Sequence, residues 1–119
     1  MIRRTIGLLA LALGTAASAA EEPPSTAEAD RLARGKAIAF DRNAGNCLSC
    51  HMMDDGELPG NSGPPLIQMQ LRFPDREVLR QQIWDPRIRN PDTVMPPYGA
   101  NLILTEEELD LLVDYVLSL

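Results

Sequence analysis

Residues 47–51 read Cys-Leu-Ser-Cys-His, and this haem motif contains the only two cysteines and the only histidine of the chain. In a C-x-x-C-H sequence each thiol adds to a vinyl group of a haem, and the histidine ligates the iron. One helical turn that begins at the first cysteine presents the three side chains together. The motif therefore predicts one covalently attached haem c, bound by Cys47 and Cys50, with His51 as its proximal ligand.

Three other interpretations of the two cysteines are a zinc site, a redox pair and a disulfide. A structural zinc ion needs four ligands, and no cysteine or histidine remains outside the motif to complete the set. A thioredoxin-like pair follows a β-strand, whereas residues 40–46 have the composition of a helix end and a turn. Haem attachment is favoured over all three.

The N-terminal residues have the pattern of a secretory signal peptide. Arg3 and Arg4 precede an apolar run at residues 6–13, and Ala-Ser-Ala follows at 17–19. The run is shorter than the roughly 20 apolar residues that span a bilayer. We expect residues 1–19 to be cleaved, with export to the periplasm of a Gram-negative bacterium and no stable membrane insertion afterwards. Residues 20–119 then form a single small domain.

The charge balance limits the classes of partner. The full chain has a formal net charge of −6, and removal of Arg3 and Arg4 would make the mature protein still more acidic. An acidic surface argues against binding to nucleic acid or to an anionic membrane. It remains compatible with protein partners.

The first helix is predicted at residues 26–41. Ser25 and Glu28 have the spacing of a capping box, which marks a helix start. Gly35 lies inside this helix, where glycine costs about 1 kcal/mol relative to alanine. Close approach of a second helix would explain it, and Tyr115 is the expected contact.

The rest of the chain is predicted to be helices and loops. Short helices are expected at residues 66–71 and 74–84, separated from later elements by loops at 54–65 and 86–101 that are rich in glycine and proline. A second capping box at 105–108 begins a C-terminal helix with apolar residues at helical spacing: Leu109, Leu112, Val113, Val116 and Leu117. No segment has a strand pattern, so the fold class is all-α.

The second axial ligand decides what the haem does. The two methionines directly after the haem motif cannot reach around the ring, which leaves Met69 and Met95. Met95 lies in a proline-stiffened segment, residues 92–99, here called the Met loop. It is favoured as the second ligand, because Met69 lies in an apolar stretch typical of a core. Histidine and methionine together close the iron to other ligands and raise its potential. This favours an electron carrier over a haem enzyme or a ligand sensor with an open iron.

The order of these features resembles the class I cytochromes c: a first helix, the haem motif, a Gly-Pro loop at 63–65, the Met loop and a C-terminal helix. The resemblance implies that residues 20–119 form one cytochrome c domain. Its N- and C-terminal helices would pack around the haem, with one or two short helices between. It also implies that the carbonyl of Pro64 accepts a hydrogen bond from Nδ1 of His51. Further candidates, as donors to the haem propionates, are Trp84, Arg87, Arg89 and Tyr98.

Residues 45–119 resemble more closely still the SoxX family, the monohaem subunits of the sulfur-oxidation cytochrome SoxAX. The similarity is carried by residues 59–66, 73–76 and 90–99, which read PGNSGPPL, FPDR and NPDTVMPPYG. It implies a SoxA partner subunit that joins thiosulfate oxidatively to a cysteine of the carrier SoxYZ, an L-cysteine S-thiosulfotransferase activity. It also implies a small downstream cytochrome as electron acceptor.

Because the haem would consume both cysteines, no thiol chemistry can occur on this chain. The isolated chain is therefore expected to transfer electrons and not to be an enzyme. The alternative is a free-standing periplasmic c-type carrier, or the haem subunit of another oxidoreductase.

Overall fold

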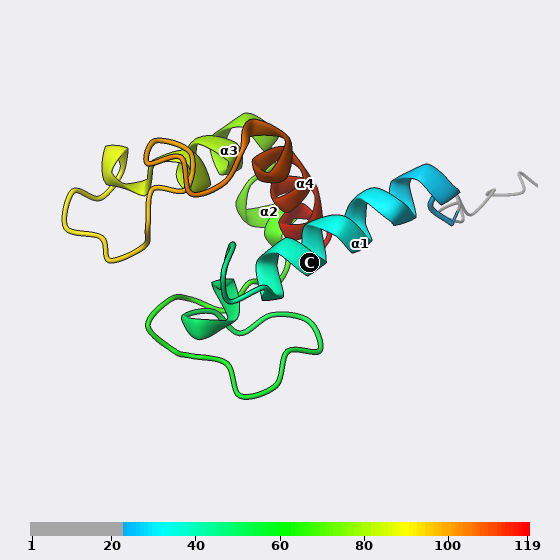
Figure 1. Ribbon diagram of the computed structural model, residues 1–119, viewed down its shortest axis with the longest axis horizontal. Coiled ribbons are helices and arrows are strands. Elements are labelled where there is room, and N and C mark those ends of the chain that lie inside the picture. Colours follow the sequence, from blue (N-terminus) through cyan, green and yellow to red (C-terminus); the bar gives the residue numbers. More distant parts are fainter. Residues whose placement is uncertain (1–22) are drawn as a thin grey trace, which may run out of the picture.

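The computed structural model describes residues 23–119, and this part of the chain is helical (Figure 1). The predicted signal peptide, residues 1–19, lies outside the described residues. The only β structure in the described part is an isolated bridge between Met53 and Leu66. The all-α prediction is confirmed. The elements are α1 (Thr26–Phe40), the 3-10 helix η1 (Cys47–Ser49), α2 (Met69–Arg72), α3 (Arg76–Trp84), the 3-10 helix η2 (Pro86–Ile88) and α4 (Glu106–Leu117).

The starts of α1 and α4 coincide with the two predicted capping sites. At α4 both halves of the box are formed: Glu108 N–H donates to Thr105 Oγ1 at 3.2 Å, and Thr105 N–H donates to Glu108 Oε2 at 2.9 Å. At α1 the structure has the serine half, in which Glu28 N–H donates to Ser25 Oγ at 3.3 Å. Each cap satisfies backbone donors that the first helical turn leaves unpaired.

Helix α1 packs across α4 at Gly35, as the sequence predicts (Figure 1). A Cβ atom at Gly35 would lie 2.1 Å from the carbonyl oxygen of Leu111 and 2.7 Å from Cβ of Tyr115. The hydrogen atom of glycine thus allows the two backbones to approach closely. Arg31 and Asp114 form an ion pair across the same contact.

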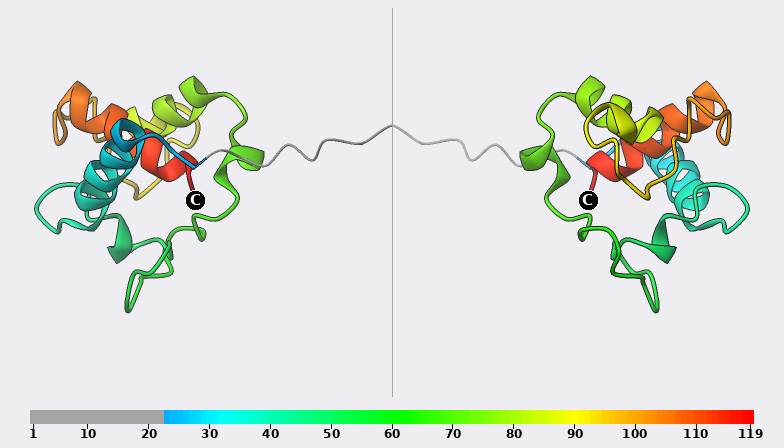
Figure 2. Two further views of the ribbon diagram at one scale, coloured as in Figure 1. Left: turned by 90° about the vertical axis from the view of Figure 1, so that its right-hand side faces the viewer. Right: turned by 90° about the vertical axis from the view of Figure 1, so that its left-hand side faces the viewer.

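Helix α4 is buried on more sides than its apolar spacing predicts. Leu111 and Tyr115, which lie outside the predicted face, are 2% and 3% exposed, and the carbonyl of Leu111 and Cβ of Tyr115 lie against Gly35 of α1. Helix α3 packs against α4 as well, through buried Leu79 and Ile83. Figure 2 shows α1, α3 and α4 grouped together, with the segment between η1 and α2 looping away from them. Within residues 23–119 no helix has the length and apolar character needed to cross a membrane.

We expect Gly35→Ala to destabilise the protein although alanine is the better helix former. The added methyl group meets backbone atoms of α4, and such overpacking typically costs about 1 to 3 kcal/mol. Ala33→Gly, at an exposed position of α1, is the control and should lose about 1 kcal/mol from helix propensity alone. Thermal unfolding of the haem-loaded proteins measures both effects. A Gly35→Ala protein as stable as the wild type would contradict the close crossing.

Candidate haem-binding site

The haem motif forms the single turn that its spacing predicts. Asn46 has a left-handed backbone, with φ of 49°, and turns the chain into η1. The carbonyl of Cys47 then accepts hydrogen bonds from the N–H groups of Cys50, at 3.1 Å, and of His51, at 2.9 Å. Both cysteines are half-buried free thiols. The turn therefore presents two sulfurs and an imidazole within five residues.

The chemistry around the thiols disfavours the redox and zinc interpretations. Burial raises the pKa of the Cys47 thiol to about 12, so it stays protonated at neutral pH, whereas a reactive redox cysteine needs a lowered pKa. Across residues 23–119 no group of three or more His, Cys, Asp or Glu side chains is placed to hold a metal ion. A tetrahedral zinc site needs such a group.

The loop after the motif returns to hold the imidazole of His51. Nδ1 lies 2.7 Å from the carbonyl oxygen of Pro64, and because that oxygen can only accept, Nδ1 carries the hydrogen. The neutral ring then has its free lone pair on Nε2, which is the tautomer that an iron ligand requires. Gly63 lies against the ring: a Cβ there would be 2.3 Å from Cε1 and 2.6 Å from Nδ1. Its N–H donates to the carbonyl of Cys50 at 2.9 Å, which fixes the loop to the motif.

A cavity of about 610 Å³ brings together six of the site residues that the sequence predicts. These residues come from η1, the loop after it and the Met loop: Cys47, Cys50, His51, Pro64, Met95 and Tyr98. The other walls include apolar side chains of α2, α3 and α4: Met69, Leu79, Ile83, Leu112 and Val116. Free thiols, an imidazole, a thioether and apolar walls are a donor set that fits a covalently held haem. The roles of the individual residues at the haem stay predictions.

Both candidate methionine ligands line the cavity, but their surroundings differ. Met95 is half-buried in the Met loop, where its N–H donates to Thr93 Oγ1 at 3.1 Å. Met69 is 2% exposed within the core, and the guanidinium of Arg72 lies 3.3 Å from its sulfur. A sulfur that already accepts from an arginine is the poorer candidate, and ligation by Met95 stays a prediction.

The four residues proposed as donors to haem propionates lie in different environments. Tyr98 lines the cavity, but its O–H donates to the carbonyl of Gly45, which uses its single donor hydrogen. Arg87 forms two hydrogen bonds to Asp85, and these, together with the opposite charge, hold its pKa above the usual range. Trp84 packs against Gly99, where a Cβ would lie 1.8 Å from the indole.

Arg89, the fourth proposed donor, lies over the ring of Phe73, with its Cζ 5.9 Å from the ring centroid. Of Trp84, Arg87 and Arg89, none lines the cavity. Their role as donors to the haem propionates stays a prediction.

Two arginines that the sequence analysis missed do line the cavity. They are Arg42, in the turn before the motif, and Arg72, at the end of α2. Neither forms an ion pair within the described residues, and no Asp or Glu lines the cavity. The cavity of an acidic chain is thus bordered by positive charge. In the sequence, the only indication that an arginine lies at the cavity was the position of Arg42 shortly before the haem motif.

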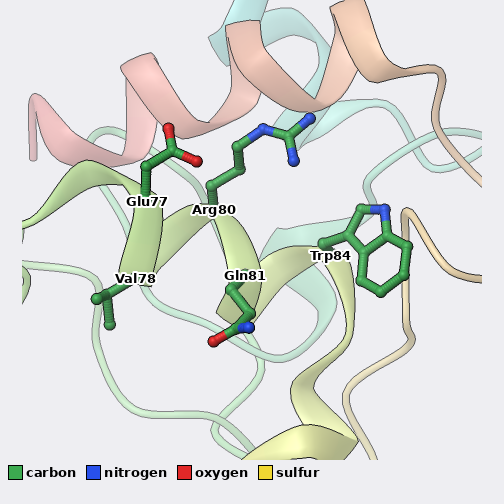
Figure 3. Close-up of a pocket in the computed structure, with 5 residues that line it drawn as sticks. All are labelled: Glu77, Val78, Arg80, Gln81 and Trp84. Atoms are coloured by element: carbon green, nitrogen blue, oxygen red, sulfur yellow. The ribbon is translucent and has the colours of Figure 1, made fainter.

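A second, shallower pocket of about 390 Å³ runs along α3 (Figure 3). Figure 3 shows Glu77 and Arg80 pointing toward α4, while Val78 and Gln81 point away from it. Arg80 is paired with Glu106 and Asp110 of α4. The lining holds no cysteine, histidine or methionine, so this pocket is not a candidate for haem.

Comparison with known proteins identifies the family. The family described as cytochrome c oxidase, cbb3-type, subunit III matches residues 30–116. The chain belongs to this cytochrome c family. A search of curated proteins finds no match to this cytochrome. Because a c-type cytochrome domain binds its haem covalently, Cys47 and Cys50 are the cysteines available for attachment.

A solved structure shares the fold of this cytochrome. It is a chain of the crystal structure of SoxXA from P. pantotrophus, with a TM-score of 0.66 and 22% sequence identity. The alignment covers 73% of this chain and 80% of that chain. The prediction of a class I cytochrome c-like fold is confirmed, since the helical order and this likeness agree.

We expect Gly63→Ala to disturb the proximal side of the site. The loop backbone is held by its hydrogen bond to Cys50, so the added methyl group must displace the ring of His51 and break its bond to Pro64. The yield of haem-loaded protein should fall several-fold, and the low-spin electron paramagnetic resonance spectrum should change. Ser62→Ala, which adds no bulk at the neighbouring position, is the control. Identical spectra for both variants would contradict the close contact between Gly63 and the ring of His51.

Proposed function

We propose that this cytochrome is the monohaem electron-transfer subunit, SoxX, of a periplasmic SoxAX complex. The observation that carries the proposal is the cavity, which unites the only cysteines and the only histidine with Met95 in a fold similar to a chain of SoxXA. The segments that resemble the SoxX family support it, because they form part of the cavity wall. Residues 59–66 contain Gly63 and Pro64, which contact the ring of His51, and residues 90–99 contain Met95 and Tyr98.

Four side chains would hold the haem. Cys47 and Cys50 would form the thioether bonds, and Nε2 of His51 and the sulfur of Met95 would ligate the iron. When bound, the haem supplies a one-electron Fe(II)/Fe(III) couple. Pro64 keeps the imidazole in one orientation, and the prolines of the Met loop limit the entropy that Met95 would gain by dissociating.

Arg42 and Arg72 are the donors that we assign to the propionates of the haem. They line the cavity and lack carboxylate partners among the described residues, unlike Arg87. A carboxylate removed from water needs charged or hydrogen-bonding partners, and a guanidinium supplies both.

In this proposal the sulfur chemistry takes place on the partner subunit. With both cysteines attached to the haem, the chain has no thiol left to accept thiosulfate. A SoxA subunit would join thiosulfate to the cysteine of SoxYZ, and this chain would take the released electrons. A small soluble cytochrome would receive them.

The family match favours a second candidate. The family is described as a subunit of a cytochrome c oxidase, so a haem subunit of another oxidoreductase, or a free-standing carrier, has a similar site. The haem ligands are the same in both functions, and only the partner differs.

Purification of the tagged mature protein from its own periplasm separates the two. We expect it to elute with a second haem protein, and the pair to release electrons to a soluble cytochrome when thiosulfate and SoxYZ are added. Elution of the chain alone would support the free-standing carrier, and co-elution with oxidase subunits would support a haem subunit of another oxidoreductase.

Replacement of the proposed sixth ligand tests the electron relay. Met95→Ala should keep the haem covalently attached but lose the red absorption band of sulfur bound to ferric iron. The potential should fall by on the order of 0.1 V, because axial ligands set haem potentials over about 0.8 V. Thiosulfate turnover by the reconstituted complex should then fall. Met52→Ala, next to the motif but unable to reach the far side of the ring, is the control; an unchanged spectrum in Met95→Ala would point to Met69.

A further inference from the structure

The side chain of Tyr98 connects two segments of the cavity wall that are far apart in the sequence. Its O–H donates to the carbonyl of Gly45, a separation of 53 residues. Tyr98 is 7% exposed, and both residues line the cavity. Gly45 lies two positions before Cys47, and Tyr98 lies three positions after Met95. The hydrogen bond therefore joins the haem motif to the Met loop.

The backbone of Tyr98 is also hydrogen-bonded to two other segments of the chain. Its N–H donates to the carbonyl of Ile83 at 3.3 Å, and its carbonyl accepts from Ile103 at 2.9 Å and from Leu104 at 3.1 Å. The C-terminal end of α3 and the segment before α4 thus hold the end of the Met loop.

The other partner, Gly45, is equally constrained. Its N–H donates to the carbonyl of Ile38 in α1 at 3.0 Å, and a Cβ at Gly45 would lie 2.7 Å from that oxygen and 3.1 Å from Sγ of Cys47. Among the described residues no other hydrogen bond reaches the carbonyl of Gly45. Loss of the phenol would leave this carbonyl unsatisfied.

The backbone between Met95 and Tyr98 has little conformational freedom. The two residues between them are prolines, whose rings fix the backbone φ angles. A shift of the phenol relative to the haem motif would therefore also shift Met95.

We propose that Tyr98 is a positioning residue whose hydrogen bond to Gly45 holds the Met loop against the haem motif, and thereby keeps Met95 on the iron. The inference rests on the proposed function, in which Met95 is the sixth ligand. It assigns the phenol to the geometry of the ligand and not to a propionate.

The test compares Tyr98→Phe with Tyr115→Phe in the haem-loaded protein. Tyr115 is the only other tyrosine; it is also buried, its O–H donates to Asp54 at 3.3 Å, and it does not line the cavity. Imidazole displaces a methionine from ferric iron, so its affinity reports how readily the Met loop opens. We expect Tyr98→Phe to bind imidazole about tenfold more tightly than the wild type, the equivalent of one lost hydrogen bond. Tyr115→Phe should stay within about twofold.

Thermal unfolding separates positioning from general stability. Both variants lose the hydrogen bond of one buried tyrosine and should unfold at lower temperature, but only Tyr98→Phe should gain imidazole affinity. Equal affinities in the two variants would overturn the proposal. If Tyr98→Phe does not accumulate with haem, 3-fluorotyrosine in place of Tyr98 keeps the hydroxyl and makes it a stronger donor. That protein should bind imidazole more weakly, and unchanged or tighter binding would overturn the proposal.

The wild-type spectrum distinguishes failure of the positioning role from failure of the proposed ligand. A wild type with the sulfur–iron band, and with Tyr98→Phe behaving like Tyr115→Phe, would refute the positioning role alone. A wild type without the band would refute Met95 as ligand, and the role of Tyr98 with it.

Discussion

Two sulfurs and one imidazole on a single turn can hold a haem from one side only, and the rest of the fold has to supply the other sides. The loop after η1 returns to fix His51 through Pro64 and Gly63. Residues 93–98 and helix α4 complete the cavity from the opposite end of the sequence. The site is therefore a product of contacts between distant segments, although its most recognisable part occupies five consecutive residues.

Helix α4 links the site to the remainder of the protein. Leu111 and Tyr115 pack on α1 at Gly35, while Leu112 and Val116 line the cavity. A domain of this size has a small apolar core, so a cofactor in the cavity contributes burial that side chains alone do not provide. The haem site and the stability of the α1–α4 contact are thus coupled through one helix.

The parts of the structure that the sequence predicted are those with local causes. The haem motif, the caps at Ser25 and Thr105 and the close approach at Gly35 each follow from spacing or from one residue type. Periodicity identified one face of α4 but missed Leu111, because the helix is buried on two sides. Arg72 and the partner of Tyr98 depend on which loops meet across the cavity, and no local pattern carries that information.

The two candidate functions share one haem site, so the difference between them lies on the surface. Val94 and Ile103 line the cavity and are 82% and 42% exposed, which means that the cavity reaches the surface beside them. Transfer of an electron between proteins requires a partner to approach the cofactor, whereas the ligands fix only its potential. Because the proposed ligand set is the same in both candidate functions, the residues around that opening would determine which partner exchanges electrons with the haem.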